Sequence, residues 1–302
     1  FWGRGDRWGW EIDVIETFST PQRLNLDKIN DDGQADYTER LTVEKIGGMA
    51  YTTSDLLESY LLNFLESGRK KQIIFDGVPG TGKTFIAQML GKFMTQVKDS
   101  YKIGSYKFIS CHGGMSYEYL FQGLAPSDTG MLQVQKGIFA QVVDDAINNP
   151  DIYHAVVFDE INRCNIPQVL GSLLFLLENR GSKYAVDMPY AGQSIYLPEN
   201  LFIVATMNSD DRSVGILDYA FRRRFSHFMF EPSSDVLRLW ITDRYESDTD
   251  VDIDQLIRIF IALNNKLFGY DHNFQIGHSY FMTSFPLNPT NLKRLWNTEV
   301  LP

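Results

Sequence analysis

The sequence predicts a three-layer α/β domain built on a parallel sheet, followed by a smaller helical domain. Apolar strand-like runs alternate with amphipathic helical patterns up to about residue 231, and only helical patterns follow over 232–302. With 302 residues, 44% of them hydrophobic, the chain can form one large hydrophobic core and a second, smaller one. We therefore expect an N-terminal remnant and linker at 1–45, the α/β domain at 46–231 and a helical lid at 232–302.

A glycine-rich loop between the first strand and helix of this sheet marks a phosphate-binding site. Residues Gly77–Thr84 fit the pattern G-x-x-x-x-G-K-[ST] at every fixed position. Glycines let the backbone wrap an anion, while inward N–H groups and the helix N-terminus supply positive charge. The candidate nucleotide-binding residues are Gly77, Pro79, Gly80, Thr81, Gly82, Lys83 and Thr84. Lys83 would reach the β- and γ-phosphates, and Thr84 would ligate Mg²⁺. The alternative is a glycine turn with a chance lysine. The buried strand Gln72–Asp76 before the loop and the helical spacing after it favour a nucleoside triphosphate site.

The other elements follow from the same periodicities. Further strands are expected at 107–111, 153–159, 201–207 and 225–230. Helices are expected from a stripe between Leu56 and Leu65, and at 116–123, 138–146, 236–241 and 253–268, the last closed by Gly269.

Composition and charge narrow the function classes. The net charge is −10 and no basic stripe is visible, which argues against a protein that grips DNA chiefly by its phosphates. Any nucleic-acid role would need a local patch, a missing domain or a partner. Cys111 and Cys164 have neither disulfide-framework nor zinc-site spacing, so we expect a cytoplasmic protein. We expect no signal peptide and no membrane span. The start without Met and the end at Pro302 suggest a fragment.

Two carboxylates end the strand Val156–Glu160, at the edge of a parallel sheet where ligands collect. Asp159 would hold Mg²⁺ through its water shell, and Glu160 would orient and deprotonate the attacking water. The alternative is a pair of exposed acids that cap the next helix. Asn165 and Pro167 already supply such a cap, which favours the catalytic interpretation.

Polar residues further along the chain can complete this site. Asn208 ends the next strand and could contact the γ-phosphate or the attacking water, or it could simply form a turn. Arg222–Arg224 follow an apparent helix at 215–221, and their side chains point in three directions, so at most two serve one site. They could be cations near a helix C-terminus, worth about 0.3–1 kcal/mol. They could instead offer an arginine to a neighbouring subunit, worth about 10³–10⁵ in rate.

Several of these segments together resemble the AAA+ motor domain of the McrB family, over roughly residues 50–300. The matching segments are Gly77–Thr84, Ser116–Gly123, Phe158–Arg163, Met207–Ser213, Asp218–Phe225 and Ile276–Phe281. The phosphate loop is shared by many families, whereas the other segments in this order are far more specific. The resemblance implies an AAA+ P-loop NTPase fold, in which Ser116–Gly123 is similar to the helix-2 insertion of this clade.

The resemblance also implies an activity and partners. The family hydrolyses GTP in preference to ATP, forms hexameric rings and docks an McrC nuclease subunit that stimulates hydrolysis. By position, Asn208 corresponds to the sensor asparagine, and Arg223 and Arg224 to arginines presented across the subunit interface. Asp211 and Arg212 match a signature element linked to hydrolysis, which here carries the additional carboxylate of Asp210. DNA would be read by a missing N-terminal domain or by the partner.

The lid and the base preference complete these expectations. Gly277–Ser279 could approach the nucleotide from the lid, which makes His278 a further candidate binding residue, or it could be a structural turn. The phosphate motifs contact only the triphosphate and do not select the base. The alternatives are an ATP-driven AAA+ remodelling protein of the MoxR-like kind and a non-catalytic nucleotide-switched scaffold.

Overall fold

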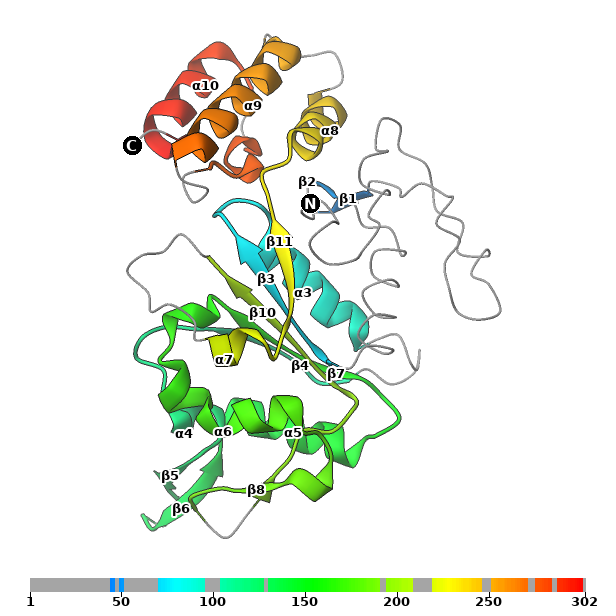
Figure 1. The fold of residues 1–302 in the computed structure, drawn as a ribbon, viewed down its shortest axis with the longest axis vertical. Coiled ribbons are helices and arrows are strands. Elements are labelled where there is room, and N and C mark those ends of the chain that lie inside the picture. Colours follow the sequence, from blue (N-terminus) through cyan, green and yellow to red (C-terminus); the bar gives the residue numbers. More distant parts are fainter. Residues whose placement is uncertain are drawn as a thin grey trace, which may run out of the picture. The chain divides into compact units, whose positions relative to one another are not determined.

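The computed structural model describes residues 44–46, 49–51, 70–95, 104–127, 130–190, 194–208, 219–245, 251–270, 275–283 and 287–300 (Figure 1). The chain divides into two compact units. One contains Leu62–Asp76 and Thr84–Phe228, and the other contains the phosphate loop Gly77–Lys83 and Met229–Pro302. In the expected N-terminal remnant and linker, only the start of β1 (Glu44–Ile46), which pairs antiparallel with β2 (Met49–Tyr51), is described. The expected helical stripe from Leu56 to Leu65 lies outside the described residues.

A five-stranded sheet carries the first unit, in the order β11-β3-β10-β7-β4. Its strands are β3 (Gln72–Gly77), β4 (Tyr106–Ser110), β7 (His154–Asp159), β10 (Leu201–Met207) and β11 (Ser226–Phe230). β10 pairs in parallel with β3 and β7, and β4 pairs in parallel with β7. The predicted parallel sheet is confirmed, each strand to within one residue at either end.

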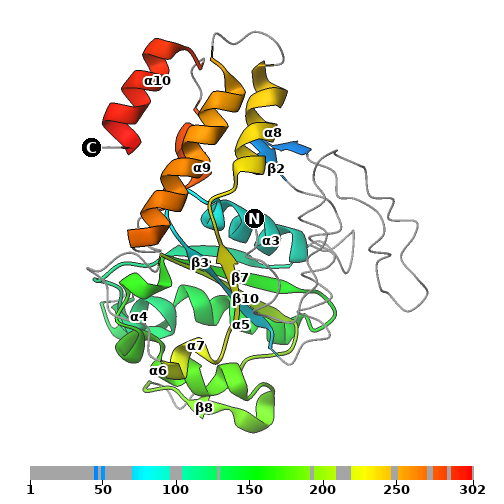
Figure 2. The ribbon, with the colours of Figure 1, turned by 45° about the horizontal axis from the view of Figure 1, so that its top comes forward.

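Helices cover both faces of this sheet, as Figure 2 shows, with α3 (Lys83–Met94) on one face and α5 (Ile138–Asn148) and α6 (Ile166–Glu178) on the other. In β7, Val156 and Phe158 pack in the core that includes α5 and α6. Val157 points the other way, where a Cβ on Gly91 of α3 would lie 2.9 Å from its Cγ2. Strands buried on both faces read as continuous apolar runs, which explains why the sequence signal was strong.

The start of α6 confirms a predicted cap. The Asn165 side chain accepts a hydrogen bond from the backbone N–H of Gln168 at 3.4 Å, and a proline lies in the first turn. Cys111 and Cys164 are both free and buried.

The predicted helix at 116–123 is wrong in its second half. The helix α4 spans only Tyr117–Leu120, and a strand, β5 (Gln122–Pro126), begins two residues later. β5 pairs antiparallel with β6 (Leu132–Lys136), so its backbone groups bond across a hairpin instead of along a helix. A second short hairpin joins β8 (Val186–Asp187) to β9 (Ser194–Ile195). Neither hairpin was expected from the sequence.

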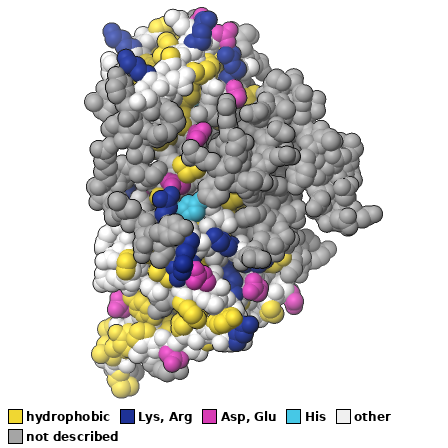
Figure 3. All heavy atoms as spheres, viewed as in Figure 1, with side chains coloured by type: hydrophobic (Ala, Val, Ile, Leu, Met, Phe, Trp, Pro, Cys, Tyr) yellow, Lys and Arg dark blue, Asp and Glu magenta, His cyan; other side chains and the backbone are white. Residues whose placement is uncertain are grey.

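The β5–β6 hairpin exposes a cluster of apolar side chains. Leu124, Met131 and Leu132 are among the most exposed large hydrophobic residues described. Figure 3 shows hydrophobic side chains gathered at the lower end of the molecule, over this hairpin. The two strands form a sheet of their own in the described part of the chain.

The second unit contains the helices α8 (Ser234–Tyr245), α9 (Ile253–Tyr270) and α10 (Pro289–Leu295). Trp240, Phe260 and Phe281 lie at the centre of its apolar core. The predicted end of α9 at Gly269 is wrong, because the helix continues to Tyr270 and a Cβ at Gly269 would meet nothing within 4 Å. None of the described helices has the combination of length and apolar character that a membrane span requires.

Candidate functional site

Three parallel strands end at the same edge of the sheet. The register pairs Met207 of β10 with Asp76 of β3, and Ala205 of β10 with Phe158 of β7. The residues that follow these ends are therefore brought to one edge, where open α/β sheets bind ligands.

The phosphate loop continues from β3 in a conformation that depends on its glycines. Gly80 and Gly82 have φ of +76° and +87°, a region that other residues rarely adopt. The buried Lys83 ammonium donates hydrogen bonds of 2.8 Å to the carbonyls of Gly77 and Val78. The Thr81 hydroxyl donates to the Val78 carbonyl at 2.9 Å. The lysine is thus directed at its own loop, and a phosphate held there would offer it a stronger, charged acceptor.

The segment Gly277–Phe281 lies directly against this loop. The Ser279 N–H donates to the Gly80 carbonyl at 2.9 Å, and a Cβ on Gly277 would lie 2.2 Å from the Gly80 carbonyl carbon. His278 is buried, and its Nδ1 accepts a hydrogen bond from the Ser233 N–H at 3.1 Å. Burial lowers the pKa of His278 to about 3, so the imidazole is neutral near pH 7. The structure therefore places His278 as a buried anchor of the segment that contacts the loop.

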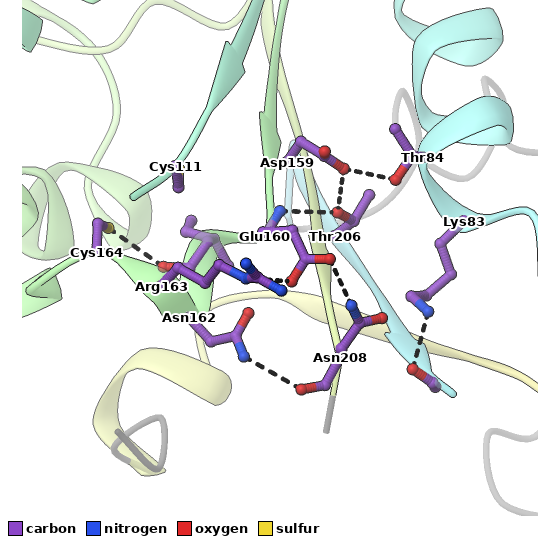
Figure 4. A network of polar contacts seen from close by, with 12 residues as sticks. Lys83, Thr84, Cys111, Asp159, Glu160, Asn162, Arg163, Cys164, Thr206 and Asn208 are labelled. Atoms are coloured by element: carbon purple, nitrogen blue, oxygen red, sulfur yellow. Dashed lines mark hydrogen bonds and ion pairs between the residues drawn. The ribbon is translucent and has the colours of Figure 1, made fainter. Parts of the chain in front are cut away.

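Asp159 lies between two threonine hydroxyls at the end of β7 (Figure 4). Its Oδ1 accepts hydrogen bonds from Thr84 Oγ1 at 2.6 Å and from Thr206 Oγ1 at 2.7 Å. Thr84 is the last residue of the phosphate-binding motif. The structure therefore brings this last residue of the motif into direct contact with the acidic strand end.

Glu160 is held by both its backbone and its carboxylate. It is the single non-glycine residue with positive φ among those described, at φ 54° and ψ 46°. Its N–H donates to Thr206 Oγ1 at 3.0 Å. Its carboxylate accepts hydrogen bonds from Asn208 Nδ2 and, at 3.2 Å, from Arg163 Nε. Such a left-handed residue costs about 1–3 kcal/mol, and strain of this kind clusters at functional sites.

Asn208 is positioned from a second side as well. Its carbonyl accepts a hydrogen bond from Asn162 Nδ2 at 3.1 Å. Its own Oδ1 is buried, and no donor reaches it from the part of the chain that the structure describes. A free acceptor beside the Glu160 carboxylate can bind a water molecule that the carboxylate also contacts (Figure 4).

The oxygen ligands near the loop suit a hard cation. No cluster of three or more His, Cys, Asp or Glu side chains that could hold a metal occurs among the described residues. Mg²⁺ does not need such a cluster, since it is usually bound by one or two protein oxygens together with waters and substrate phosphates. Thr84 and Asp159 provide oxygens of this kind.

The three arginines differ in their surroundings. The helix α7 (Tyr219–Arg222) ends at the first of them, whose Nη2 lies 3.6 Å from the buried carboxylate of Asp76. Arg223 and Arg224 both pair with Glu178, at 3.4 Å and 3.2 Å. The Arg224 side chain is only 12% exposed, against 55% for Arg223. Arg224 also donates to the Leu174 carbonyl at 2.7 Å, so it packs against its own chain.

Two candidate residues stay predictions. Asp211 and Arg212 lie within 209–218, outside the described residues, as does Asp210. Conversely, the sequence did not single out Thr206 and Arg163, both of which contact Glu160. The signal that could have identified Thr206 is its hydroxyl in an otherwise apolar strand, on the same face of the strand as Asn208 by alternation.

The chain is similar to known proteins in both its α/β part and its helical part. Residues 72–225 match the family described as "AAA domain (dynein-related subfamily)", and residues 255–302 match "McrB, alpha-helical lid domain". The chain is 34% identical over 243 residues to the Escherichia coli "Type IV methyl-directed restriction enzyme EcoKMcrB subunit", covering 77% of this chain and 51% of that protein. It is 30% identical over 217 residues to the Bacillus subtilis "Type II restriction enzyme BsuMI component YdiS", covering 58% of this chain and 63% of that protein. The chain thus spans about half to two thirds of the length of these relatives.

Proposed function

Because the chain belongs to the AAA domain family of the dynein-related subfamily and carries an McrB-type lid, we propose that it hydrolyses GTP in a ring-shaped motor. In this proposal the motor drives restriction of modified DNA together with an McrC-like nuclease partner. The observation that carries the enzymatic part is the contact of Thr84 with Asp159, next to the Glu160–Asn208 pair. It connects the phosphate-binding motif to a carboxylate that can activate water.

The triphosphate would be held by the phosphate loop. Its N–H groups and Lys83 would bind the β- and γ-phosphates, and Thr84 and Asp159 would hold Mg²⁺. The cation would neutralise charge that develops on the phosphate oxygens during transfer. The hydrogen bond from the Lys83 ammonium to the Gly77 carbonyl, which directs this group at the loop, supports this assignment.

Glu160 and Asn208 would act on the attacking water. The unpartnered Oδ1 of Asn208 accepts one hydrogen bond from the water, while the Glu160 carboxylate accepts the other and takes the proton. The hydrogen bond between the two side chains keeps both acceptors on one side of the site.

A neighbouring subunit would complete the site with an arginine. Arg223 suits this role because more than half of its side chain is exposed, and within the described part of the chain its guanidinium pairs with the exposed carboxylate of Glu178. Arg224 would support it from beneath, since its guanidinium is largely buried against α6. A closed ring, in this proposal a hexamer, would present such an arginine to every site.

The base preference, the nuclease partner and the DNA target rest on the McrB-type relatives and motifs. In the signature element, Asp211 and Arg212 would link hydrolysis to the partner. His278 would act indirectly, by fixing the lid segment against the phosphate loop. DNA contact would come through a further domain or the partner, and the motor would work in the cytoplasm. We place the domain boundaries of this motor at residues 46–231 and 232–302.

The decisive experiment compares turnover of GTP and ATP, with and without the nuclease subunit and modified DNA. We expect GTP to be hydrolysed faster, and faster again with the partner. A clear preference for ATP would instead indicate an ATP-driven remodelling protein.

Replacement of the proposed base separates an enzyme from a nucleotide-switched scaffold. Glu160→Gln should lower turnover by about 10²–10⁴ and leave nucleotide binding intact. Glu199→Gln is the matched control, since this exposed acid precedes β10 at the opposite edge of the sheet. Unchanged hydrolysis in Glu160→Gln would refute the assignment of the base.

A further inference from the structure

Thr206 joins the two acids of the site through one hydroxyl group. The residue is 1% exposed, in a strand whose other residues, from Leu201 to Met207, are all apolar. Its Oγ1 donates to Asp159 Oδ1 at 2.7 Å and accepts the N–H of Glu160 at 3.0 Å. Among the labelled residues of Figure 4, it is the one that contacts the side chain of one acid and the backbone of the next.

The direction of both hydrogen bonds is fixed by chemistry. A backbone N–H can only donate, so the Thr206 oxygen must accept from Glu160. The one hydroxyl proton is then left for the Asp159 carboxylate. Thr206 therefore contacts both acids at once through one oxygen atom, and the donor and acceptor of each hydrogen bond cannot exchange roles.

This arrangement bears directly on the strained backbone of Glu160. A left-handed conformation costs about 1–3 kcal/mol for a residue with a Cβ. The bond from its N–H to Thr206 offsets part of that cost, and the carbonyl of Glu160 is held by the Arg163 N–H at 2.8 Å. The backbone of Glu160 is thus fixed on both sides, which sets the direction of its carboxylate toward Asn208.

We propose that Thr206 is a positioning residue for hydrolysis, which holds Asp159 and Glu160 in the relative orientation that the reaction needs. The proposal rests on the proposed function in one respect, namely that Glu160 is the base. Thr206 does not contact the reacting atoms, so its removal should lower kcat and leave nucleotide binding largely unchanged.

The test compares Thr206→Val, which keeps the size and branching but loses the hydroxyl, with Thr206→Ser, which keeps the hydroxyl. We expect kcat of Thr206→Val to fall by about 10²-fold, the usual cost of misplacing a catalytic group by about 1 Å. KM and the affinity for a non-hydrolysable triphosphate analogue should stay within about threefold, and Thr206→Ser should recover most of kcat.

Thr95→Val is the matched control. Thr95 is also buried, and its hydroxyl donates to the Lys92 carbonyl at 2.8 Å, at the end of α3. The Thr95→Val variant loses a buried threonine hydroxyl that bonds to neither Asp159 nor Glu160. Its kcat should therefore be unchanged even if its melting temperature falls. If Thr206→Val does not fold, Thr206→Ala against Thr206→Ser gives the same comparison.

Two results would overturn the proposal. One is a wild-type kcat in Thr206→Val. The other is an equal loss of kcat in the valine and serine variants, which would show that the hydroxyl is not what matters. Both are distinct from failure of the proposed function, which would appear as unchanged hydrolysis in Glu160→Gln.

Discussion

Replacing Gly277 by alanine should disrupt the phosphate loop, which the lid segment contacts directly. Gly277 has φ −64° and ψ 149°, an ordinary conformation for any residue, so alanine introduces no backbone strain there. The effect must come from the added methyl group. That Cβ would lie 2.2 Å from both the carbonyl carbon and the oxygen of Gly80, and 2.3 Å from the Pro79 carbonyl oxygen.

The size of the effect follows from this overlap. Carbon atoms in good contact are about 3.5 Å apart, so one of the two segments must move by about 1.3 Å. The lid segment cannot easily retreat, because His278 and Phe281 are buried in the core behind it. The loop therefore takes up the shift, and its N–H groups lose their alignment on the phosphates. A misplacement of about 1 Å can cost about 10²-fold in rate when it affects reacting groups, and we expect a loss of nucleotide affinity of the same order here.

Equilibrium titration with a fluorescent triphosphate analogue measures this loss. Gly269→Ala is the matched control, since its Cβ meets nothing within 4 Å in α9. It should bind nucleotide normally and be neutral or more stable by up to about 1 kcal/mol. If Gly277→Ala bound the analogue as tightly as the wild-type protein, the contact between lid segment and loop would not shape the site.

Three further predictions test the arginines, a buried histidine and the metal. Arg224→Ala should lower the melting temperature and Arg223→Ala should not, because of these two guanidinium groups only that of Arg224 is largely buried. Mixed rings of Arg223→Ala and Glu160→Gln subunits should regain partial hydrolysis, whereas a lack of hydrolysis would indicate a site within one chain. Burial lowers the pKa of His278 from 6.5 to about 3, so protonation favours the unfolded state, and stability should be full above about pH 6.5 and decline as the pH falls toward 3. His278→Gln should reduce the dependence of the unfolding free energy on pH, as measured by denaturant titrations. Part of this dependence should remain, because burial also lowers the pKa of His154 and His227. Chelation of divalent cations should abolish turnover, and added Mg²⁺ should restore it.

The sheet could be predicted from the sequence because its signals are local. Strands such as β7 and β10 are apolar from end to end and stop at polar residues, so their bounds are visible without the fold. The end of α4 was missed because it depends on a partner strand. The residues after Leu120 have a helical pattern when considered alone, but Gln122 and Gly123 pair with Lys136 and Gln135 of β6, which come later in the chain.

The site was only partly predictable for the same reason. Motif spacing identified Thr84, Asp159 and Glu160, but the hydroxyl that links the two acids comes from another strand, 46 positions beyond Glu160. The unequal burial of Arg223 and Arg224 depends on α6, which supplies Glu178. Adjacent residues of one type look alike in a sequence, and only tertiary contacts separate the exposed one from the buried one.

The strand β3 connects the arginine segment to the phosphate loop. At its start, the buried Gln72 donates its amide to the Arg224 carbonyl at 2.7 Å, and Arg180 fixes that amide by donating to its Oε1 at 3.1 Å. Lys70 donates to the carbonyls of Arg223 and, at 3.1 Å, Phe225. The other end of the strand becomes the phosphate loop at Gly77. A strand buried on both faces moves as a unit, because close-packed interiors transmit strain instead of absorbing it. In the proposed function, a shift of the loop on nucleotide binding or hydrolysis would therefore reach the arginine segment through the Arg224 carbonyl, which Gln72 of the strand holds. The two carbonyls that Lys70 holds lie against a residue shortly before the strand begins.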